Sequence, residues 1–166
     1  MPRRFARAGG RSGAEKLTGE VFYSMKVCDI MSSSVVSIDQ NEPVSAAAKL
    51  LKQCNIGALP VCDGQKRLRG ILTDRDIVTR CVAAGADPQE TPISEIMSRG
   101  VITAGPFDDI GAAVKRMSGD QVRRLPVVDG GRLVGVLSLC DMARDANCDM
   151  EAAEALTEIS SNFRRK

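Results

Sequence analysis

The chain has no histidine among its 166 residues, and its six cysteines form no Cys-x-x-Cys pair and no zinc-like spacing. Histidine is the commonest general base near neutral pH and the commonest protein metal ligand, so its absence argues against both kinds of site. The sequence also lacks a glycine-rich phosphate loop and a nucleophile–base set. We therefore expect no enzymatic activity and no bound metal. The cysteine usage fits a reducing cytoplasm, with several thiols acting as small apolar side chains.

Aromatic residues are scarce, at 3% of the chain, and tryptophan is absent. A chain with so few aromatic rings offers no platforms on which single-stranded bases stack. The formal net charge is only +2, and residues 1–24 alone carry a net +3, so the remainder lacks the basic field that duplex binding needs. No segment approaches the ~20 consecutive apolar residues that span a bilayer. We expect neither nucleic-acid nor membrane binding.

What the chain does contain is an internal repeat. Three segments recur in the same order: residues 27–32, 59–64 and 70–76 return as 93–98, 125–130 and 135–141, at offsets of 66, 66 and 65. So many matching positions in fixed order, with a single deletion in a turn, are hard to produce by chance. Two copies of one supersecondary unit therefore make up most of the protein.

Both copies have the same succession of hydrophobic patterns, namely strand, helix, strand, strand and helix. In the first copy these patterns cover residues 35–38, 44–51, 58–62, 68–72 and a helix that starts near Thr73. In the second copy they cover residues 101–104, 110–117, 124–128, 133–137 and a helix that starts near Ser138. The fold class predicted is α+β, built from two βαββα repeats.

The domain organisation follows from the repeat. Residues 25–84 form the first copy, residues 93–146 the second, and a linker at 85–92 separates them because its two prolines prevent a continuous helix. Residues 1–24, rich in arginine and glycine, are expected to be a disordered leader, unless translation begins at Met25.

The tail, residues 147–166, has apolar residues at the spacing of one helical face, namely Met150, Ala153, Leu156 and Ile159. We expect this tail to form a helix that packs on the module or on a partner subunit.

The end of each predicted hairpin has the form Gly-apolar-apolar-Thr/Ser-x-x-Asp. A threonine or serine at a strand-to-helix junction caps the helix while its hydroxyl remains able to meet a phosphate. The aspartate three residues later lies on the same face, where its carboxylate can accept both hydrogens of a ribose diol. For Thr73 with Asp76, and for Ser138 with Asp141, the alternative interpretation is a capping box that satisfies only backbone N–H groups.

With the Ile-Met opening, the Leu-Pro-Val-x-Asp segment and this ending present twice and in order, residues 25–143 resemble a tandem pair of cystathionine-beta-synthase (CBS) domains, a Bateman module. The resemblance implies two βαββα units packed by pseudo-two-fold symmetry. It also implies two clefts between the repeats that take adenosine compounds such as AMP, ADP, ATP or S-adenosylmethionine. Modules of this family usually pair into a disc-shaped homodimer.

The resemblance assigns ribose hydroxyls to Asp76 and Asp141 and phosphate to Thr73 and Ser138. The remaining predicted ligand contacts frame the adenine or line the walls of the two clefts: Val36, Ile38, Gly57, Ala58, Pro60 and Arg75 in the first copy, and Ile102, Ala104, Arg123, Arg124 and Pro126 in the second.

The two predicted sites differ at corresponding positions. Gly57 and Ala58 in the first copy correspond to Arg123 and Arg124 in the second. Glycine permits close backbone approach, whereas arginine offers a fork suited to phosphate. We expect unequal affinities, although the two arginines could equally lie on a solvated edge.

The function predicted is a non-catalytic sensor that binds an adenosine-containing ligand and transmits its state to a separate effector protein. The alternative is a structural dimerisation module with degenerate, unoccupied pockets. We expect a cytoplasmic homodimer in either case.

Overall fold

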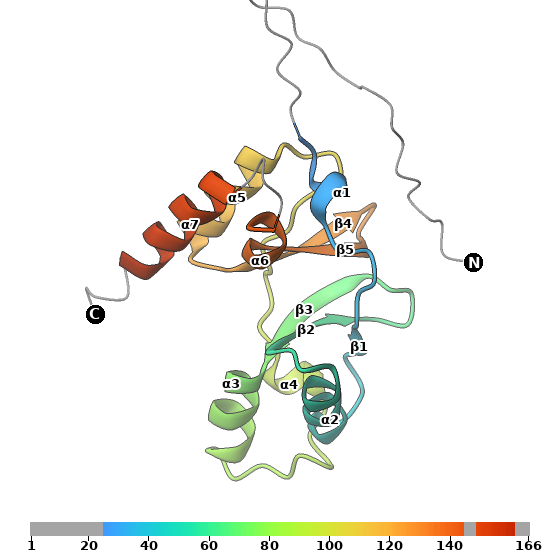
Figure 1. The fold of residues 1–166 in the computed structure, drawn as a ribbon. Helices are drawn as coiled ribbons and strands as arrows, with labels where there is room; N and C mark the ends of the chain where they lie inside the picture. Colours follow the sequence, from blue (N-terminus) through green and yellow to red (C-terminus); the bar gives the residue numbers. More distant parts are fainter. Residues whose placement is uncertain (1–24, 145–148, 162–166) are drawn as a thin grey trace, which may run out of the picture. The chain divides into compact units, whose positions relative to one another are not determined.

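The structure is a computed structural model that describes residues 25–144 and 149–161. The predicted leader, residues 1–24, lies outside the described residues. In chain order the elements are α1 (Val27–Ile30), β1 (Ile38–Asp39), α2 (Val44–Cys54), β2 (Ala58–Cys62), β3 (Leu68–Thr73), α3 (Asp74–Asp76), the π-helical η1 (Ile77–Val82), α4 (Ile93–Ile96), α5 (Ile110–Asp120), β4 (Arg124–Asp129), β5 (Arg132–Ser138), α6 (Leu139–Met142) and α7 (Asp149–Ser161) (Figure 1). The predicted mixture of helices and small sheets is confirmed.

The described residues cluster into two compact units that do not coincide with the two sequence copies. Unit 1 contains 25–33, 104–127, 135–144 and 149–161, and unit 2 contains 34–103 and 128–134. The opening helix of the first copy, α1, therefore belongs to the same unit as α5 and α6 of the second copy. The opening helix of the second copy, α4, belongs to the unit of α2 and η1. The two copies thus exchange their opening helices.

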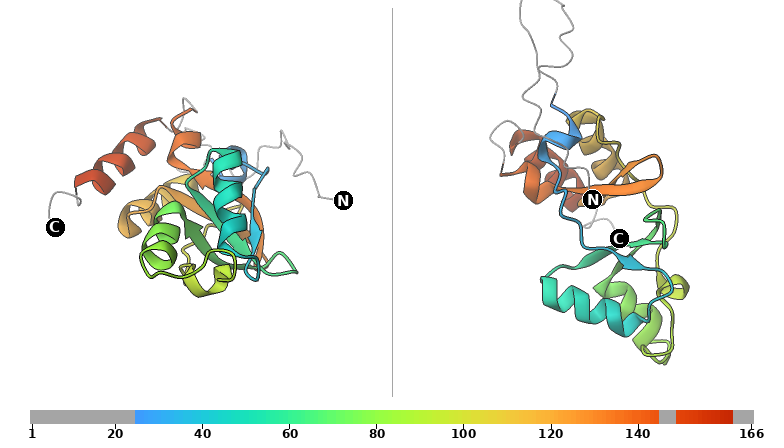
Figure 2. Two further views of the ribbon diagram at one scale, coloured as in Figure 1. Left: turned by 90° about the horizontal axis from the view of Figure 1, so that it is seen from below. Right: turned by 90° about the vertical axis from the view of Figure 1, so that its right-hand side faces the viewer.

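Unit 2 is built around a sheet with the strand order β1-β2-β3. β1 runs parallel to β2 and pairs Ile38 with Val61, while β3 returns antiparallel to β2 and pairs Leu59 with Leu72. The views of Figures 1 and 2 place α2 and the helix formed by α3 and η1 on the same side of this sheet. A strand must cross over through a helix to lie parallel to its neighbour, and α2 provides that crossover.

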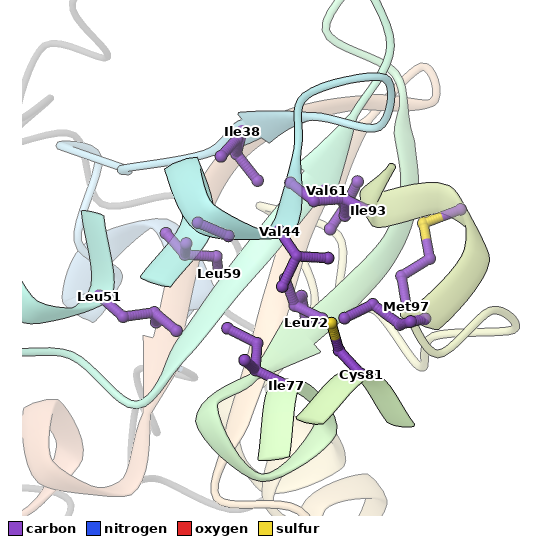
Figure 3. Close-up of a cluster of buried hydrophobic side chains, with 12 residues drawn as sticks. Ile38, Val44, Leu51, Leu59, Val61, Leu72, Ile77, Cys81, Ile93 and Met97 are labelled. Atoms are coloured by element: carbon purple, nitrogen blue, oxygen red, sulfur yellow. The ribbon is translucent and has the colours of Figure 1, made fainter. Parts of the chain in front are cut away.

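The core of unit 2 lies between the sheet and these helices. Val44, Ala47 and Leu51 recur at helical spacing along α2 and are all buried, so this amphipathic face determines how the helix docks. Figure 3 shows side chains of the sheet, α2, η1 and α4 pointing toward one another. The cysteines at positions 62 and 81 are buried, and burial is the main cause that raises the pKa of the Cys62 thiol. Cys62 therefore serves as a small apolar side chain.

In unit 1 the helix α5 docks by a buried amphipathic face, as α2 does in unit 2. Ile110, Ala113 and Met117 form the buried face of α5, at the spacing that predicted this helix. Both helices end at a residue in the left-handed conformation, Asn55 with φ of 52° and Gln121 with φ of 57°. These two residues are 66 positions apart, so the repeat extends to the geometry of the helix ends.

Two glycines in the repeat are required by a close approach of the exchanged segments. A Cβ atom at Gly70 would lie 2.6 Å from the carbonyl oxygen of Ser98, and one at Gly135 would lie 2.5 Å from Sδ of Met31. At each site the neighbouring backbones exchange two hydrogen bonds, Ile71 with Ser98 and Val136 with Ser32, at 2.9–3.0 Å. The Ile-Met-Ser motif of each copy therefore pairs with the last strand of the other copy.

Two sequence expectations differ from the structure. The extended segment predicted at 35–38 forms a strand only at Ile38–Asp39, and the segment at 101–104 forms a single parallel bridge between Ala104 and Val127. Gly100, at φ of 68°, and Pro106 flank the second segment, and both residue types interrupt regular strands.

The tail contains the helix α7, and its buried face shares Ile159 with the face expected from the sequence but not Ala153 or Leu156. α7 packs on α5 and α6 through Ala155 and Ile159, which are 1% and 4% exposed, whereas Ala153 and Leu156 are exposed. The side chain of Met150 lies outside the described residues. Of the part of the chain that the structure describes, no helix is long and apolar enough to cross a membrane.

Candidate ligand sites at the hairpin ends

In the first copy, Thr73 and Asp76 form a reciprocal cap at the junction of β3 and α3. Thr73 Oγ1 accepts from the backbone N–H of Asp76 at 3.1 Å. Asp76 Oδ2 accepts from the backbone N–H of Thr73 at 2.9 Å and from its hydroxyl at 2.7 Å. This geometry is the capping box that was the alternative interpretation of the motif. Any ligand contact of Asp76 would therefore add to a structural role that the residue already has.

The second copy has the same cap at the junction of β5 and α6. Ser138 Oγ accepts from the backbone N–H of Asp141 at 3.1 Å, and its hydroxyl donates to Asp141 Oδ2 at 2.5 Å. Ser138 is 7% exposed, which makes it a buried polar residue with a satisfied hydroxyl. Its hydroxyl oxygen keeps a second lone pair, so it can still accept from a ligand.

The carboxylate oxygen that takes no part in the cap, Oδ1, has a different partner in each of the two aspartates. Asp76 Oδ1 lies 3.3 Å from Nη2 of Arg80, whose Nη1 donates to the carbonyl oxygen of Ile96 at 2.8 Å and to Ser98 Oγ at 3.1 Å. Among the described residues, Asp141 Oδ1 has one ion-pair partner, Arg144, at 3.9 Å and with a side chain 80% exposed. The carboxylate of the first copy is therefore held more firmly than that of the second.

The backbone around the two caps is equivalent. The N–H of Asp74 donates to the carbonyl oxygen of Gly57 at 3.2 Å, and the N–H of Leu139 donates to that of Arg123 at 3.1 Å. The residues that begin the other strand of each hairpin, Gly57-Ala58 at the start of β2 and Arg123-Arg124 at the start of β4, are thereby fixed beside the cap. The side-chain difference between the copies thus falls beside each Thr/Ser–Asp pair.

A cavity of about 520 Å³ lies beside the second cap, entirely within unit 1. Eight of the described residues line it: Arg123, Arg124, Ser138, Leu139, Cys140, Ala143, Ala153 and Leu156. Both arginines are exposed, and neither has an ion-pair partner among the described residues. Small-molecule sites occupy roughly 300–1,000 Å³ and combine apolar walls with a few polar groups, which is the composition of this cavity.

The structure brings together some of the predicted contacts but not all of them. Arg123, Arg124 and Ser138 line the cavity, Ala104 and Pro126 are buried in the same unit, and Asp141 is not among the lining residues. Ile102 is half-buried and is assigned to unit 2.

The predicted contacts of the first copy all lie in unit 2 with Thr73 and Asp76. Ile38 and Pro60 are buried, Gly57 and Ala58 are half-buried, and Val36 and Arg75 are exposed. A Cβ at Gly57 would lie 3.5 Å from Oδ2 of Asp74, which places a carboxylate beside the position that corresponds to Arg123.

Sequence reasoning missed Leu139, Cys140 and Ala143, and it did not place Ala153 or Leu156 at the site. Cys140 corresponds to the predicted contact Arg75, so applying the repeat to that residue would have found it. The two residues of α7 have no counterpart in the first copy, and their helical spacing predicted a packing face, not a place in a ligand site.

No group of three or more histidine, cysteine, aspartate or glutamate side chains that could hold a metal occurs in the part of the chain described here. The described lining of the unit 1 site consists of the Ser138 cap residue, two arginines, Cys140 and apolar walls.

These features define a class of protein, namely an α+β chain of two internal repeats. In each repeat a Thr/Ser–Asp helix cap follows the last strand of a hairpin, and the residues beside this cap differ between the two copies. Residues 27–83 and 93–146 both match the CBS domain family. The chain belongs to this family and carries two CBS domains.

Curated relatives support this assignment along most of the chain. A CBS domain-containing protein of Bacillus subtilis, YhcV, is 42% identical over 134 residues, which cover 81% of this chain and 94% of that protein. Hypoxic response protein 1 of Mycobacterium tuberculosis is 39% identical over 116 residues, which cover 70% of this chain and 81% of that protein.

Two solved structures share the fold. A crystal structure of Hypoxic Response Protein I with two coordinated zinc ions superposes with a TM-score of 0.68 at 38% identity, covering 72% of this chain and 98% of that one. The CBS domain pair of protein MJ0100, in complex with 5'-methylthioadenosine and S-adenosyl-L-methionine, superposes with a TM-score of 0.64 at 34% identity, covering 72% and 94%.

Proposed function

We propose that this chain is a non-catalytic sensor module that binds an adenosine-containing ligand and passes its state to another protein. The observation that carries the proposal is the cavity of about 520 Å³ beside Ser138, where two exposed arginines, neither ion-paired to another described residue, meet an apolar lining. That a CBS domain pair of the same fold is complexed with S-adenosyl-L-methionine and 5'-methylthioadenosine supports the ligand class.

The two sites are proposed to select different members of that class. Arg123 and Arg124 supply forked donors for a phosphate, so the unit 1 cavity favours an anionic nucleotide such as AMP, ADP or ATP. In unit 2 the corresponding residues are uncharged, and the Asp74 carboxylate beside Gly57 repels phosphate. That site favours a ligand without phosphate, such as S-adenosylmethionine.

In each site the aspartate is proposed to accept the ribose hydroxyls through Oδ1, because Oδ2 already caps the helix. Phosphate cannot donate a hydrogen bond, so contact with Thr73 or Ser138 would require the hydroxyl proton to turn away from the aspartate. We therefore assign phosphate in unit 1 mainly to the arginines. The adenine is proposed to lie against the strand residues Ile38 and Ala104, with Pro60 and Pro126 in the opposite wall.

The second candidate function is a structural dimerisation module whose pockets remain empty. One observation favours it: both capping boxes are complete, so the Thr/Ser–Asp pairs are explained without any ligand. The two candidates differ in whether adenosine compounds bind, and in either case we propose a homodimer.

Calorimetric titration of the full chain with AMP, ATP, S-adenosylmethionine and 5'-methylthioadenosine tests the proposal. We expect Arg124→Gln to weaken ATP binding by about ten- to a hundredfold, because a charge-assisted hydrogen bond contributes ~1.5–3 kcal/mol. The control Arg132→Gln, an exposed arginine that does not line the cavity, should leave binding unchanged. Thermal stabilisation by ~2.7 kcal/mol at a hundredfold excess over Kd gives an independent readout. No binding of any compound would favour the structural module.

A further inference from the structure

The cavity of unit 1 is partly walled by an element that lies beyond the CBS domain. The family match ends at residue 146, yet α7 contributes Ala153 and Leu156 to the lining. α7 is thus a feature of this chain in addition to its two domains, and it lies against the same cavity as Ser138 and the two arginines.

α7 presents two different apolar faces. Ala155 and Ile159 are buried, as expected for residues that dock a helix on α5 and α6. Leu156 is a large apolar side chain that remains 49% exposed although its helix is docked, and it lines the cavity. Covering such a side chain with an apolar ligand group is favourable, because the free energy of burial scales with the apolar area removed from water.

We infer that α7 forms one wall of the unit 1 ligand site and contacts the bound ligand. Ala153 and Leu156 contact the uncharged part of the ligand, while Arg123 and Arg124 hold its anionic part. The inference rests on the proposed function and adds a wall that the CBS domains alone do not supply. The cavity already has the volume of a small-molecule site with α7 in place, so the helix completes the site instead of filling it.

A regulatory consequence follows from linkage. If the ligand contacts α7, it binds more tightly to the form in which α7 is docked, and by reciprocity the bound ligand favours docking. The fraction of molecules in which α7 is docked therefore depends on the occupancy of this site. α7 is then the element through which a partner protein detects the ligand.

Two variants of the full chain test the part of the cavity wall that α7 supplies, one by removing a side chain and one by enlarging it. Leu156→Ala removes the half-exposed side chain and leaves Ala155 and Ile159 to dock the helix. Ala153→Trp fills the cavity from the same helix. Glu154→Ala is the matched control, because Glu154 is exposed on α7 and does not line the cavity. Circular dichroism of each variant verifies that the helix content is retained.

Cys140 provides a local readout. It is an exposed free thiol that lines the cavity, whereas Cys54, at the end of α2 in unit 2, is exposed elsewhere. The probes are ATP and S-adenosylmethionine, and the measurement is the concentration that protects Cys140 from a maleimide, mapped by peptide mass spectrometry. Amide exchange over residues 153–160 reports the docking of α7 in the same samples.

We expect a bound probe to protect Cys140 but not Cys54, and to slow amide exchange in α7. Leu156→Ala should raise the half-protecting concentration by about tenfold, the effect of removing apolar contacts from a binding pocket. Ala153→Trp should abolish protection, and Glu154→Ala should match the wild type. If the wild type binds a probe and Leu156→Ala binds it equally well or more tightly, the inference about α7 is overturned while the proposed function stands. Failure of the wild type to bind either probe would overturn the proposed function with it.

Discussion

Arg80 joins the Asp76 carboxylate to the exchanged helix α4. Its Nη2 lies 3.3 Å from Asp76 Oδ1, and its Nη1 donates to the carbonyl oxygen of Ile96 at 2.8 Å. One guanidinium thereby ties the helix cap of the first copy to the opening segment of the second, within unit 2. In unit 1 the Asp141 carboxylate pairs instead with Arg144, which follows it by three residues where Arg80 follows Asp76 by four, and the two groups lie 3.9 Å apart.

We predict that Arg80→Met lowers the free energy of unfolding by about 1–2 kcal/mol, because it removes charged hydrogen bonds to a partly buried carbonyl group. Arg144→Met is the matched control and should change stability by less than about 0.5 kcal/mol, as is typical of exposed ion pairs. Urea denaturation of both variants gives the comparison. Equal effects of the two substitutions would contradict the role assigned to Arg80.

The two close glycine contacts predict unequal costs for the same substitution. In Gly70→Ala the new Cβ meets the Ser98 backbone oxygen at 2.6 Å, whereas in Gly135→Ala its nearest neighbour is the Met31 sulfur and the Ser32 oxygen lies at 3.2 Å. A methionine side chain can move more easily than a paired backbone. We expect Gly70→Ala to destabilise by about 2–3 kcal/mol and Gly135→Ala by about 1 kcal/mol. Thermal denaturation would reveal a reversed order.

The left-handed ends of α2 and α5 predict two stabilising substitutions. Gln121, at φ of 57°, carries a side chain that disfavours this conformation, while Asn55, at 52°, belongs to a type that tolerates it. Gln121→Gly should therefore raise the free energy of unfolding by about 0.5–1 kcal/mol. Asn55→Gly should have a smaller effect. Chemical denaturation decides the order, and a loss of stability in Gln121→Gly would contradict the cap assignment.

Asp108 predicts a pH-dependent contribution to stability. The backbone N–H of Gly105 donates to Asp108 Oδ2 at 2.9 Å, and this hydrogen bond, followed by the Arg116 guanidinium at 2.7 Å, lowers the pKa of the carboxyl group. A lowered folded-state pKa stabilises the protein above the unfolded value of ~3.9, and this contribution is lost as the pH falls through the folded-state pKa.

The corresponding experiment compares the wild type with Asp108→Asn. Because Asp108 and Arg116 are partly exposed, the difference at pH 7 is expected to be about 0.5–1 kcal/mol. It should shrink as the pH falls below the unfolded-state value of ~3.9 and through the lowered folded-state pKa, where the folded carboxylate becomes protonated, and in 1 M salt, which screens the ion pair. A difference that persists unchanged under acid would show that charge is not its source.

Much of this fold could be predicted because its apolar residues recur at regular spacing and the same pattern occurs in both copies. Val44, Ala47 and Leu51 predict the buried face of α2, and the offset of 66 carries that prediction to α5. The same comparison located Arg123 and Arg124 beside a cap, where they line a cavity.

Other features have no periodic or local signature. The exchange of α1 and α4 depends on contacts such as that of Met31 with Gly135, which are distant in sequence and identical in pattern in both copies. The face by which α7 docks was also mispredicted. Its apolar residues fit more than one helical face, and only packing on α5 and α6 selects Ala155 and Ile159 over Leu156.

The exchange of opening helices bears on how such a chain can be divided. One copy alone lacks the helix that completes its own unit, so a single repeat of this sequence could complete that unit only with a second chain. Cleavage within residues 85–92 should accordingly yield two fragments that are incomplete apart and complement each other when mixed, since each carries the other's missing helix.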